Sequence, residues 1–198
     1  MSIARGPVGW WRFDGNLLDA SGNGNHGTVG AGSAAYAAGK YGRAWNNNST
    51  RFIDLPAGNS VLGSTVTNLT ISAWVKVDDI AAETLQRFVS FSSATTGGAT
   101  AFALRKDGTK ITTIGPSSTI YYNGDLYANQ DITQGEWFHF AAVWSGVSQE
   151  VSNYPGAIGV YRFSDNQHLR GQIDNVMIHT RALSPSEIKT LHALGSPI

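Results

Sequence analysis

The chain has 198 residues, of which 41% are hydrophobic and 14% are charged, against roughly 25% charged residues in an average soluble domain. The 14 basic residues balance the 14 acidic ones, which speaks against nucleic acid or an anionic membrane surface as partner. The absence of cysteine excludes disulfides, thiol catalysis and cysteine-ligated zinc. The length suits one β-sandwich, so we expect a single domain over residues 1–198.

The N-terminal segment shows no apolar core of a signal peptide before Trp10. No later stretch approaches the roughly 20 apolar residues that a membrane-spanning helix needs. We therefore expect neither a signal peptide in this chain nor membrane insertion. Two localisations stay open: a virion or extracellular surface, if the protein assembles or a leader was removed, and otherwise the cytoplasm.

Short apolar runs between turn residues predict many antiparallel strands. In chain order the expected strands are Val8–Phe13, Gly42–Trp45, Phe52–Leu55, Leu69–Val77, Arg87–Phe91, Phe102–Lys106, Thr109–Ile114, Thr119–Tyr122, Trp137–Trp144, Ala157–Phe163 and Gly171–His179. The run at 69–77 alternates with period two, and the run at 137–144 is apolar at nearly every position, which is typical of a strand buried on both faces. Asp107-Gly108 predicts a tight hairpin between 102–106 and 109–114.

One helix is expected at the C-terminal end. Ser184 is a favoured N-cap residue, Pro185 suits the first helical position, and Glu187 completes a capping box. Ile188, Leu191 and Leu194 follow at helical spacing. The sequence therefore predicts an all-β fold closed by one short C-terminal helix.

Five motifs in a fixed order carry a family resemblance. They are WRFDGN at 11–16, DASGNGNHG at 19–27, LTISAWV at 69–75, GEWFHFA at 135–141 and GQIDNVMI at 171–178, followed by RALS at 181–184. Together they resemble laminin-G-like domains of the concanavalin A-like lectin/glucanase superfamily, from about Trp10 to Leu194. The resemblance implies a jelly-roll sandwich of two antiparallel sheets, with the first strand near the strand at 171–179. Residues 147–156 depart from the family pattern as a polar insertion.

The loop from 19 to 27 contains residue types that bind calcium. Calcium takes six to eight oxygen ligands, which a bending backbone can bring together. Asp19 and Asn25 offer side-chain oxygens, and the glycines of the loop allow the carbonyls of Asn23 and His26 to point inward. A structural calcium ion is therefore one interpretation of this loop.

Asp14 and Asp174 lie on strands that are expected nearby, and the resemblance implies that calcium sits where the early loop meets Asp174. The expected metal ligands are Asp14, Asp19, Asn23, Asn25, His26 and Asp174. The alternative is that the Ser, Gly and Asn residues of the loop only form turns, and that Asp14 and Asp174 cap backbone amides. Both interpretations stay open at this point.

Catalysis is not expected. Glycoside hydrolysis needs two carboxylates at one bond, and the four glutamates stand apart at Glu83, Glu136, Glu150 and Glu187. A polysaccharide lyase would need a Tyr or His base among Arg and Gln side chains on one face. Nothing in the sequence places Arg87, Arg105 and the two tyrosines at 121–122 on one face. His139 lies in the apolar strand and is expected in the core.

Four tyrosines lie in or beside polar, loop-like stretches: Tyr121, Tyr122, Tyr127 and Tyr154. Aromatic faces stack on sugar rings, and exposed tyrosines also occur in assembly interfaces. Two functions therefore stay open. One is a non-catalytic module that binds a glycan or surface glycoprotein, as the resemblance suggests. The other is a structural subunit that decorates a phage or viral particle, in the capsid or tail, and contacts other virion subunits or copies of itself.

Overall fold

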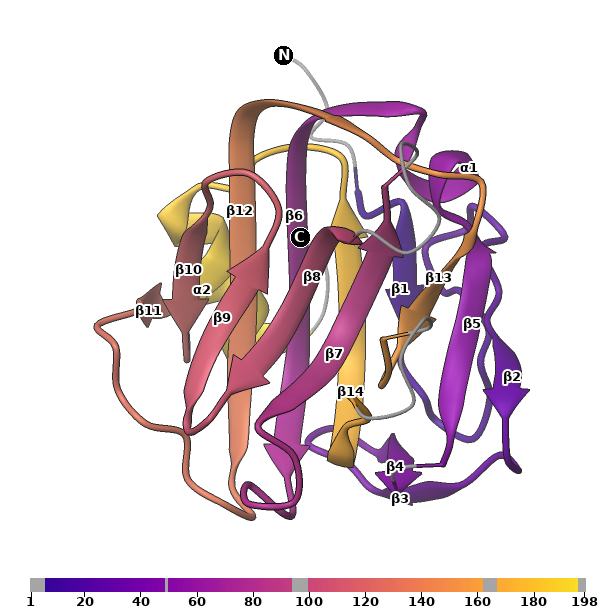
Figure 1. Ribbon diagram of the computed structural model, residues 1–198, viewed down its shortest axis with the longest axis vertical. Helices are drawn as coiled ribbons and strands as arrows, with labels where there is room; N and C mark the ends of the chain where they lie inside the picture. Colours follow the sequence, from indigo (N-terminus) through magenta and orange to yellow (C-terminus); the bar gives the residue numbers. More distant parts are fainter. Residues whose placement is uncertain (1–5, 49, 94–99, 162–166, 196–198) are drawn as a thin grey trace.

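Two antiparallel sheets pack face to face in the computed structural model, which describes residues 6–48, 50–93, 100–161 and 167–195 (Figure 1). The larger one, sheet A, has the order β11 (Asp125–Leu126), β10 (Thr119–Tyr122), β12 (Trp137–Glu150), β6 (Thr65–Val77), β14 (Arg170–His179), β4 (Arg43–Asn48) and β3 (Tyr36–Ala38), with β1 (Gly9–Trp11) also paired to β14. Sheet B has the order β2 (Thr28–Ala31), β5 (Phe52–Ala57), β13 (Pro155–Ile158), β7 (Leu85–Ser92), β8 (Thr100–Asp107) and β9 (Lys110–Ile114). The predicted jelly-roll sandwich is confirmed.

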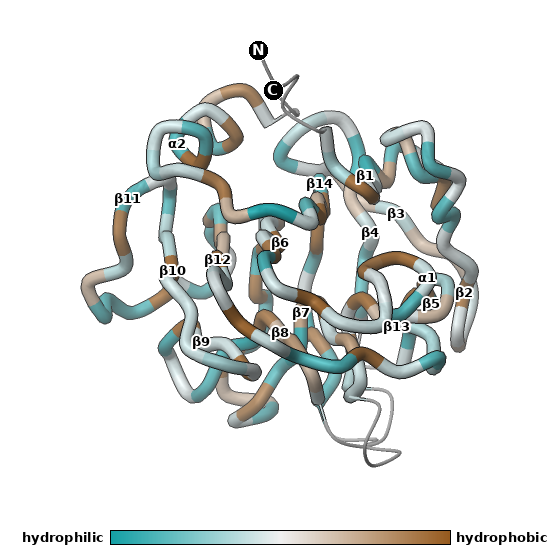
Figure 2. The backbone as a smooth tube through the Cα atoms, turned by 90° about the horizontal axis from the view of Figure 1, so that it is seen from above, coloured by the Kyte–Doolittle hydropathy of each residue, from teal (hydrophilic) through white to brown (hydrophobic). Residues whose placement is uncertain are grey.

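Strand β12 is buried on both faces over residues 138–144, as its continuous apolar sequence predicts. Phe138, Phe140 and Trp144 belong to the core between the sheets. Ala141 and Val143 point to the other side, where they pack with apolar residues of the C-terminal helix α2 (Pro185–Leu194). Figure 2 shows α2 outside sheet A, on the side away from sheet B. The helix therefore covers apolar surface that one sheet face would otherwise expose to water.

Helix α2 has the N-terminal signals that the sequence predicts. The backbone N–H of Glu187 donates to the Ser184 hydroxyl, and the Glu187 carboxylate accepts from the backbone N–H of Ser184 at 2.8 Å. Ile188 and Leu191 are buried, whereas Leu194 is 58% exposed, contrary to the apolar face that we expected to include it. Leu194 is the last residue of the helix, directly before the C-cap Gly195. Neither described helix has the length and apolar content that crossing a bilayer requires.

Several elements differ from the sequence prediction. The short strands β2, β3 and β11 and the helix α1 (Gly58–Leu62) were not expected, because segments of two to five residues carry little periodicity. The expected polar insertion at 147–156 is in part the continuation of β12, which pairs with β6 as far as Glu150 after a register shift. The strand expected at 157–163 ends at Ile158, and residues 162–163 lie outside the described part of the chain.

A lysine ammonium is buried at one end of sheet B. Lys106 is fully buried, and its Nζ donates to the backbone carbonyls of Ile80, Glu83, Thr84 and Gly108 at 2.5–3.3 Å. Burial of a charge is tolerated only when the charge is hydrogen-bonded, and here four carbonyl dipoles surround it. Lys106 therefore ties the connection after β6 to the β8–β9 hairpin.

Two histidines are buried in sheet A. His139 is 2% exposed and His179 is fully buried, and neither ring nitrogen of His179 has a hydrogen-bond partner among the described residues. Burial, together with the charge of Arg181, lowers the pKa of His179 to about 4, and burial lowers the pKa of His139 to about 3. Both imidazoles are therefore neutral in the folded protein at neutral pH.

We expect His179→Leu to reduce the loss of stability in acid. Between pH 6.5 and 4 the unfolded chain protonates this histidine and the folded chain does not, so the histidine contributes stability that is present above pH 6.5 and is lost as the pH falls towards 4. The free energy of unfolding of wild type should therefore fall by up to about 3 kcal/mol more than that of the variant. Urea unfolding from pH 7 to 4 measures both. Parallel pH profiles would contradict the prediction.

Candidate functional site

Asp19 organises the loop that contains most of the expected metal ligands. Its Oδ1 accepts the backbone N–H groups of Trp10 at 2.9 Å and Ser21 at 2.8 Å. Its Oδ2 accepts the Ser21 hydroxyl at 2.8 Å and the backbone N–H of Asn25 at 2.9 Å. Asp19 is 6% exposed. The carboxylate thus joins strand β1 to the loop through four protein donors.

These hydrogen bonds determine the protonation of Asp19. Burial raises the pKa of its carboxyl group, but the Ser21 side chain and the backbone N–H groups of Trp10, Ser21 and Asn25 outweigh it, so the pKa is lowered on balance. Hydrogen bonds to a carboxylate stabilise its charged form. Asp19 is therefore an ionised structural anchor at neutral pH.

The other loop residues also bond within the protein. The Asn25 side-chain amide donates to the carbonyl of Val8 at 2.7 Å, and the Asn25 carbonyl accepts from the indole of Trp11. The Asn23 amide donates to Pro7 at 3.2 Å, and Nδ1 of His26 accepts the backbone N–H of Asp19 at 3.0 Å.

Asp174 and Asp14 hold a different segment, the turn at 39–43. Oδ2 of Asp174 accepts the backbone N–H of Tyr41 at 2.9 Å, and Oδ1 of Asp14 accepts that of Arg43 at 3.0 Å. Gly42 has φ 65°, and a Cβ there would lie 2.2 Å from Asp14, so this turn needs glycine. Burial raises the pKa of Asp174 to about 7, and the nearby charge of Asp14 adds to this effect.

This geometry does not fit the expected calcium site. Calcium needs free oxygen ligands, whereas the Asp19 oxygens face N–H and O–H donors. Asp14 and Asp174 accept N–H groups of the turn at 39–43, whereas Asp19 accepts those of β1 and its own loop. Within the described residues no three His, Asp or Glu side chains form a metal-binding group. The contacts favour turn chemistry and amide capping, and calcium stays a prediction that only a binding measurement tests.

The four tyrosines do not form one surface. Tyr121 is 7% exposed beneath α2, and the Tyr122 ring stacks on Phe138 at 5.5 Å and packs against the main core. Tyr127 packs near Tyr122, and its hydroxyl donates to the carbonyl of Gln130. Tyr154 is 44% exposed and lies apart from these three, before β13. Of the four expected ligand-binding residues, Tyr154 presents the most surface.

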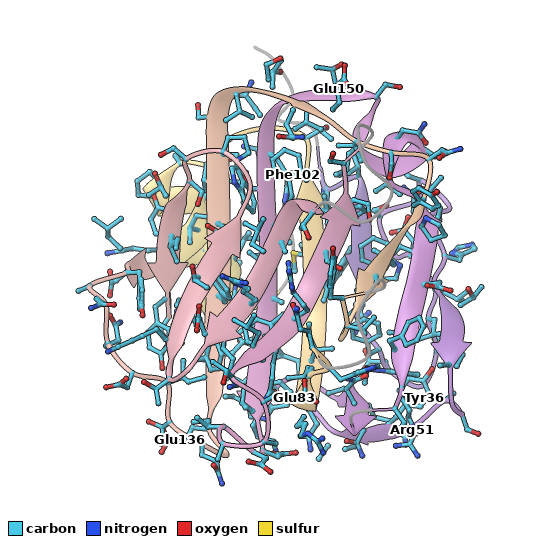
Figure 3. The ribbon with its side chains drawn as sticks, viewed as in Figure 1. Tyr36, Arg51, Glu83, Phe102, Glu136 and Glu150 are labelled. Atoms are coloured by element: carbon cyan, nitrogen blue, oxygen red, sulfur yellow. The ribbon has the colours of Figure 1, made fainter. Side chains whose placement is uncertain are left out.

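Tyr154 lines a pocket of about 390 Å³. The other lining residues, which the sequence did not single out, are Asn59, Ser64, Thr65, Glu150, Val151, Ser152 and Asn153. Thr65 and Glu150 are paired at the ends of β6 and β12, so the pairing of the two longest strands places the pocket. In Figure 3, Glu150 lies at one end of the sandwich and Glu83 and Glu136 lie at the opposite end.

Backbone hydrogen bonds hold the walls of this pocket. The N–H of Asn59 donates to the carbonyl of Ser152 at 2.9 Å, and the N–H of Gly58 donates to that of Tyr154 at 2.8 Å. The N–H of Val151 donates to the carbonyl of Ser64 at 3.1 Å. The pocket thus combines an aromatic ring, hydroxyls, amides and one carboxylate on a fixed frame, which is the chemistry that holds a neutral sugar.

Asp19→Ala should destabilise the protein by about 2–4 kcal/mol, because it leaves four buried or half-buried donors without their acceptor. Urea unfolding at pH 7 measures the loss. Asp125→Ala is the matched control, since that carboxylate is 76% exposed and its ion pair with Lys189 lies at the surface, so a change within about 0.5 kcal/mol is expected. Equal effects of the two substitutions would show that Asp19 is not an anchor.

The melting midpoint tests calcium directly. Because protein donors surround Asp19, we expect the same midpoint in excess chelator and in millimolar calcium. A calcium ion at a hundredfold excess over its Kd would instead add about 2.7 kcal/mol of stability. Such a rise, lost in Asp174→Asn, would establish the calcium site that the family resemblance implies.

The fold is similar to that of several solved proteins. Domain 4 of AbnA, a GH43 extracellular arabinanase from Geobacillus stearothermophilus solved with arabinotriose, is 23% identical, with a TM-score of 0.60 over 94% of this chain and 98% of that one. Trypanosoma rangeli sialidase in complex with 2,3-difluorosialic acid is 15% identical, with a TM-score of 0.65 over 94% of this chain. The binding domain of Paraclostridial Mosquitocidal Protein 1 is 16% identical, with a TM-score of 0.64 over 94% of this chain.

This chain spans a third of the sialidase and about half of the mosquitocidal binding domain. These identities are low, so the structural likeness establishes the fold alone. No curated protein matches the sequence. The model of the concanavalin A-like lectin/glucanases superfamily, of laminin-G type, matches residues 46–155, which is more than half of the chain, and the chain therefore belongs to this superfamily.

Proposed function

We propose that the chain is a non-catalytic carbohydrate-binding module that holds a sugar in the pocket beside Tyr154. The observation that carries the proposal is the position of this 44% exposed ring in a pocket of hydroxyl, amide and carboxylate groups. A pyranose or furanose presents an apolar face to the ring and hydroxyls to Asn59, Ser64 and Glu150. Membership of a lectin-like superfamily and the likeness to an arabinanase domain solved with arabinotriose support it.

The placement of the carboxylates supports a binding role over hydrolysis. Glu150, the carboxylate in the pocket, lies at the end of the sandwich opposite Glu83 and Glu136, and Glu187 is engaged by Ser184 and Arg181. Glycoside hydrolysis needs two carboxyl groups within about 10 Å across one bond. The glutamates therefore suit hydroxyl recognition better than bond cleavage.

A glycan array followed by calorimetry on the best ligand tests the proposal. Tyr154→Ala should weaken binding about five- to thirtyfold, because it removes about 1–2 kcal/mol of ring stacking, and should leave the melting midpoint nearly unchanged. Leu126→Ala is the control, since it removes a 66% exposed apolar side chain from β11, a strand that contributes no lining residue to the pocket.

Two results would decide against this function. If Tyr154→Ala binds the best glycan with unchanged affinity, the pocket beside Tyr154 is not the binding site. If no glycan on the array binds and the protein forms concentration-dependent oligomers or associates with virus particles, the structural subunit is favoured instead.

A further inference from the structure

Two arginines lie side by side on the outer face of sheet B. Arg87 on β7 stands directly opposite Arg105 on β8. The neighbouring pair Val89 and Leu104 points into the core, so Arg105, next along its strand, points outward together with Arg87. Like charges directly opposite each other destabilise a sheet, so this pairing calls for a physical explanation.

The Arg87 guanidinium is held and desolvated, and no described carboxylate neutralises it. Arg87 is 4% exposed, its Nε donates to the Gln167 side chain at 2.8 Å, and its guanidinium lies 4.5 Å from the ring centre of Tyr161. Its Nη1 is buried without a hydrogen-bond partner, and in the described part of the chain no carboxylate pairs with it. Burial, with the charge of Arg105, lowers the pKa of Arg87 to about 10, so it stays charged at neutral pH.

Arg105 has donor capacity to spare as well. Its Nε is buried without a partner among the described residues, and its Nη2 lies 3.6 Å from the Asp107 carboxylate, which is 49% exposed. An exposed ion pair at this distance contributes little. Within the described residues, each arginine therefore keeps a buried nitrogen without a hydrogen-bond partner.

A pocket of about 350 Å³ lies next to this pair. Its lining residues are Ala82, Glu83, Thr84, Leu85 and Gln167, so the residue that holds Arg87 also forms a pocket wall. Within the described ranges Oε2 of Glu83 is buried without a partner, and Oε1 lies 3.5 Å from Arg170. An unpaired carboxylate oxygen and an amide are groups that bind sugar hydroxyls.

We propose that Arg87 and Arg105 bind the carboxylate of a hexuronic acid unit in an acidic polysaccharide, with Glu83 and Gln167 receiving its hydroxyls. Gln167 occupies Nε of Arg87, which leaves the Nη end of the planar guanidinium for a planar carboxylate. One carboxylate between both arginines also removes their repulsion. The inference rests on the proposed function in taking the ligand to be a glycan, but it uses a surface other than the Tyr154 pocket.

Calorimetry with the whole chain tests this site. The ligands are oligosaccharides of galacturonate, glucuronate and mannuronate, each compared with its neutral methyl ester. At least one uronate should bind, and its ester should bind at least tenfold more weakly. Arg105→Gln and Arg87→Gln should each weaken uronate binding at least tenfold. Arg12→Gln, which removes a 55% exposed arginine from another surface, should not.

Tyr154→Ala separates this inference from the proposed function, since it should leave uronate binding intact. Neutral glycans that bind through Tyr154 while every uronate fails would overturn the arginine site alone. Equal affinity for acid and ester, unchanged binding in Arg105→Gln, or inorganic sulfate binding as tightly as the best uronate would also overturn it. Arg105 is partly exposed, so its variant gives an answer even if Arg87→Gln does not fold.

Discussion

The pairing of strand β14 on both edges is the constraint on which the rest of the structure depends. One edge pairs with β6 along most of its length, and the other is divided between β4 and β1. Asp174 and Asn175 lie between the part of β14 that pairs with β4 and the part that pairs with β1. Asp174 accepts the backbone N–H of Tyr41 in the turn at 39–43, and Asn175, with φ 46°, accepts the indole N–H of Trp10. Strand β1, the 39–43 turn and the centre of sheet A are therefore joined directly to one another.

The polar residues of this frame differ in what they do for the fold. Asp19, Asp174 and the Ser184–Glu187 capping box meet backbone donors and satisfy them. Arg87 and Arg105, by contrast, keep buried nitrogens without partners. Buried groups that a fold leaves unsatisfied cost stability, so the unsatisfied nitrogens of this arginine pair need a physical explanation. The proposed carboxylate ligand supplies one for Arg87 and Arg105.

Sequence periodicity predicted the long strands and the capping of α2, because alternation and capping residues act locally. It failed for β2, β3 and β11, whose few residues are extended only because neighbours pair with them. The Tyr154 pocket joins residues from 59 to 154, and the arginine pair depends on the register between β7 and β8. Such sites follow from strand order, which spacing along the chain does not encode. Tyr121 resembled an exposed residue because helix α2, which covers it, lies sixty residues further on.

At one end of sheet B, the ammonium group of Lys106 occupies a position among four carbonyls that a metal ion could otherwise fill. A metal ion coordinated by four carbonyls leaves when it is diluted or sequestered, and its occupancy follows the ionic conditions outside. An ammonium group on a covalent tether cannot leave on dilution or be removed by a chelator. The loop that Lys106 holds therefore needs no metal ion from the surroundings.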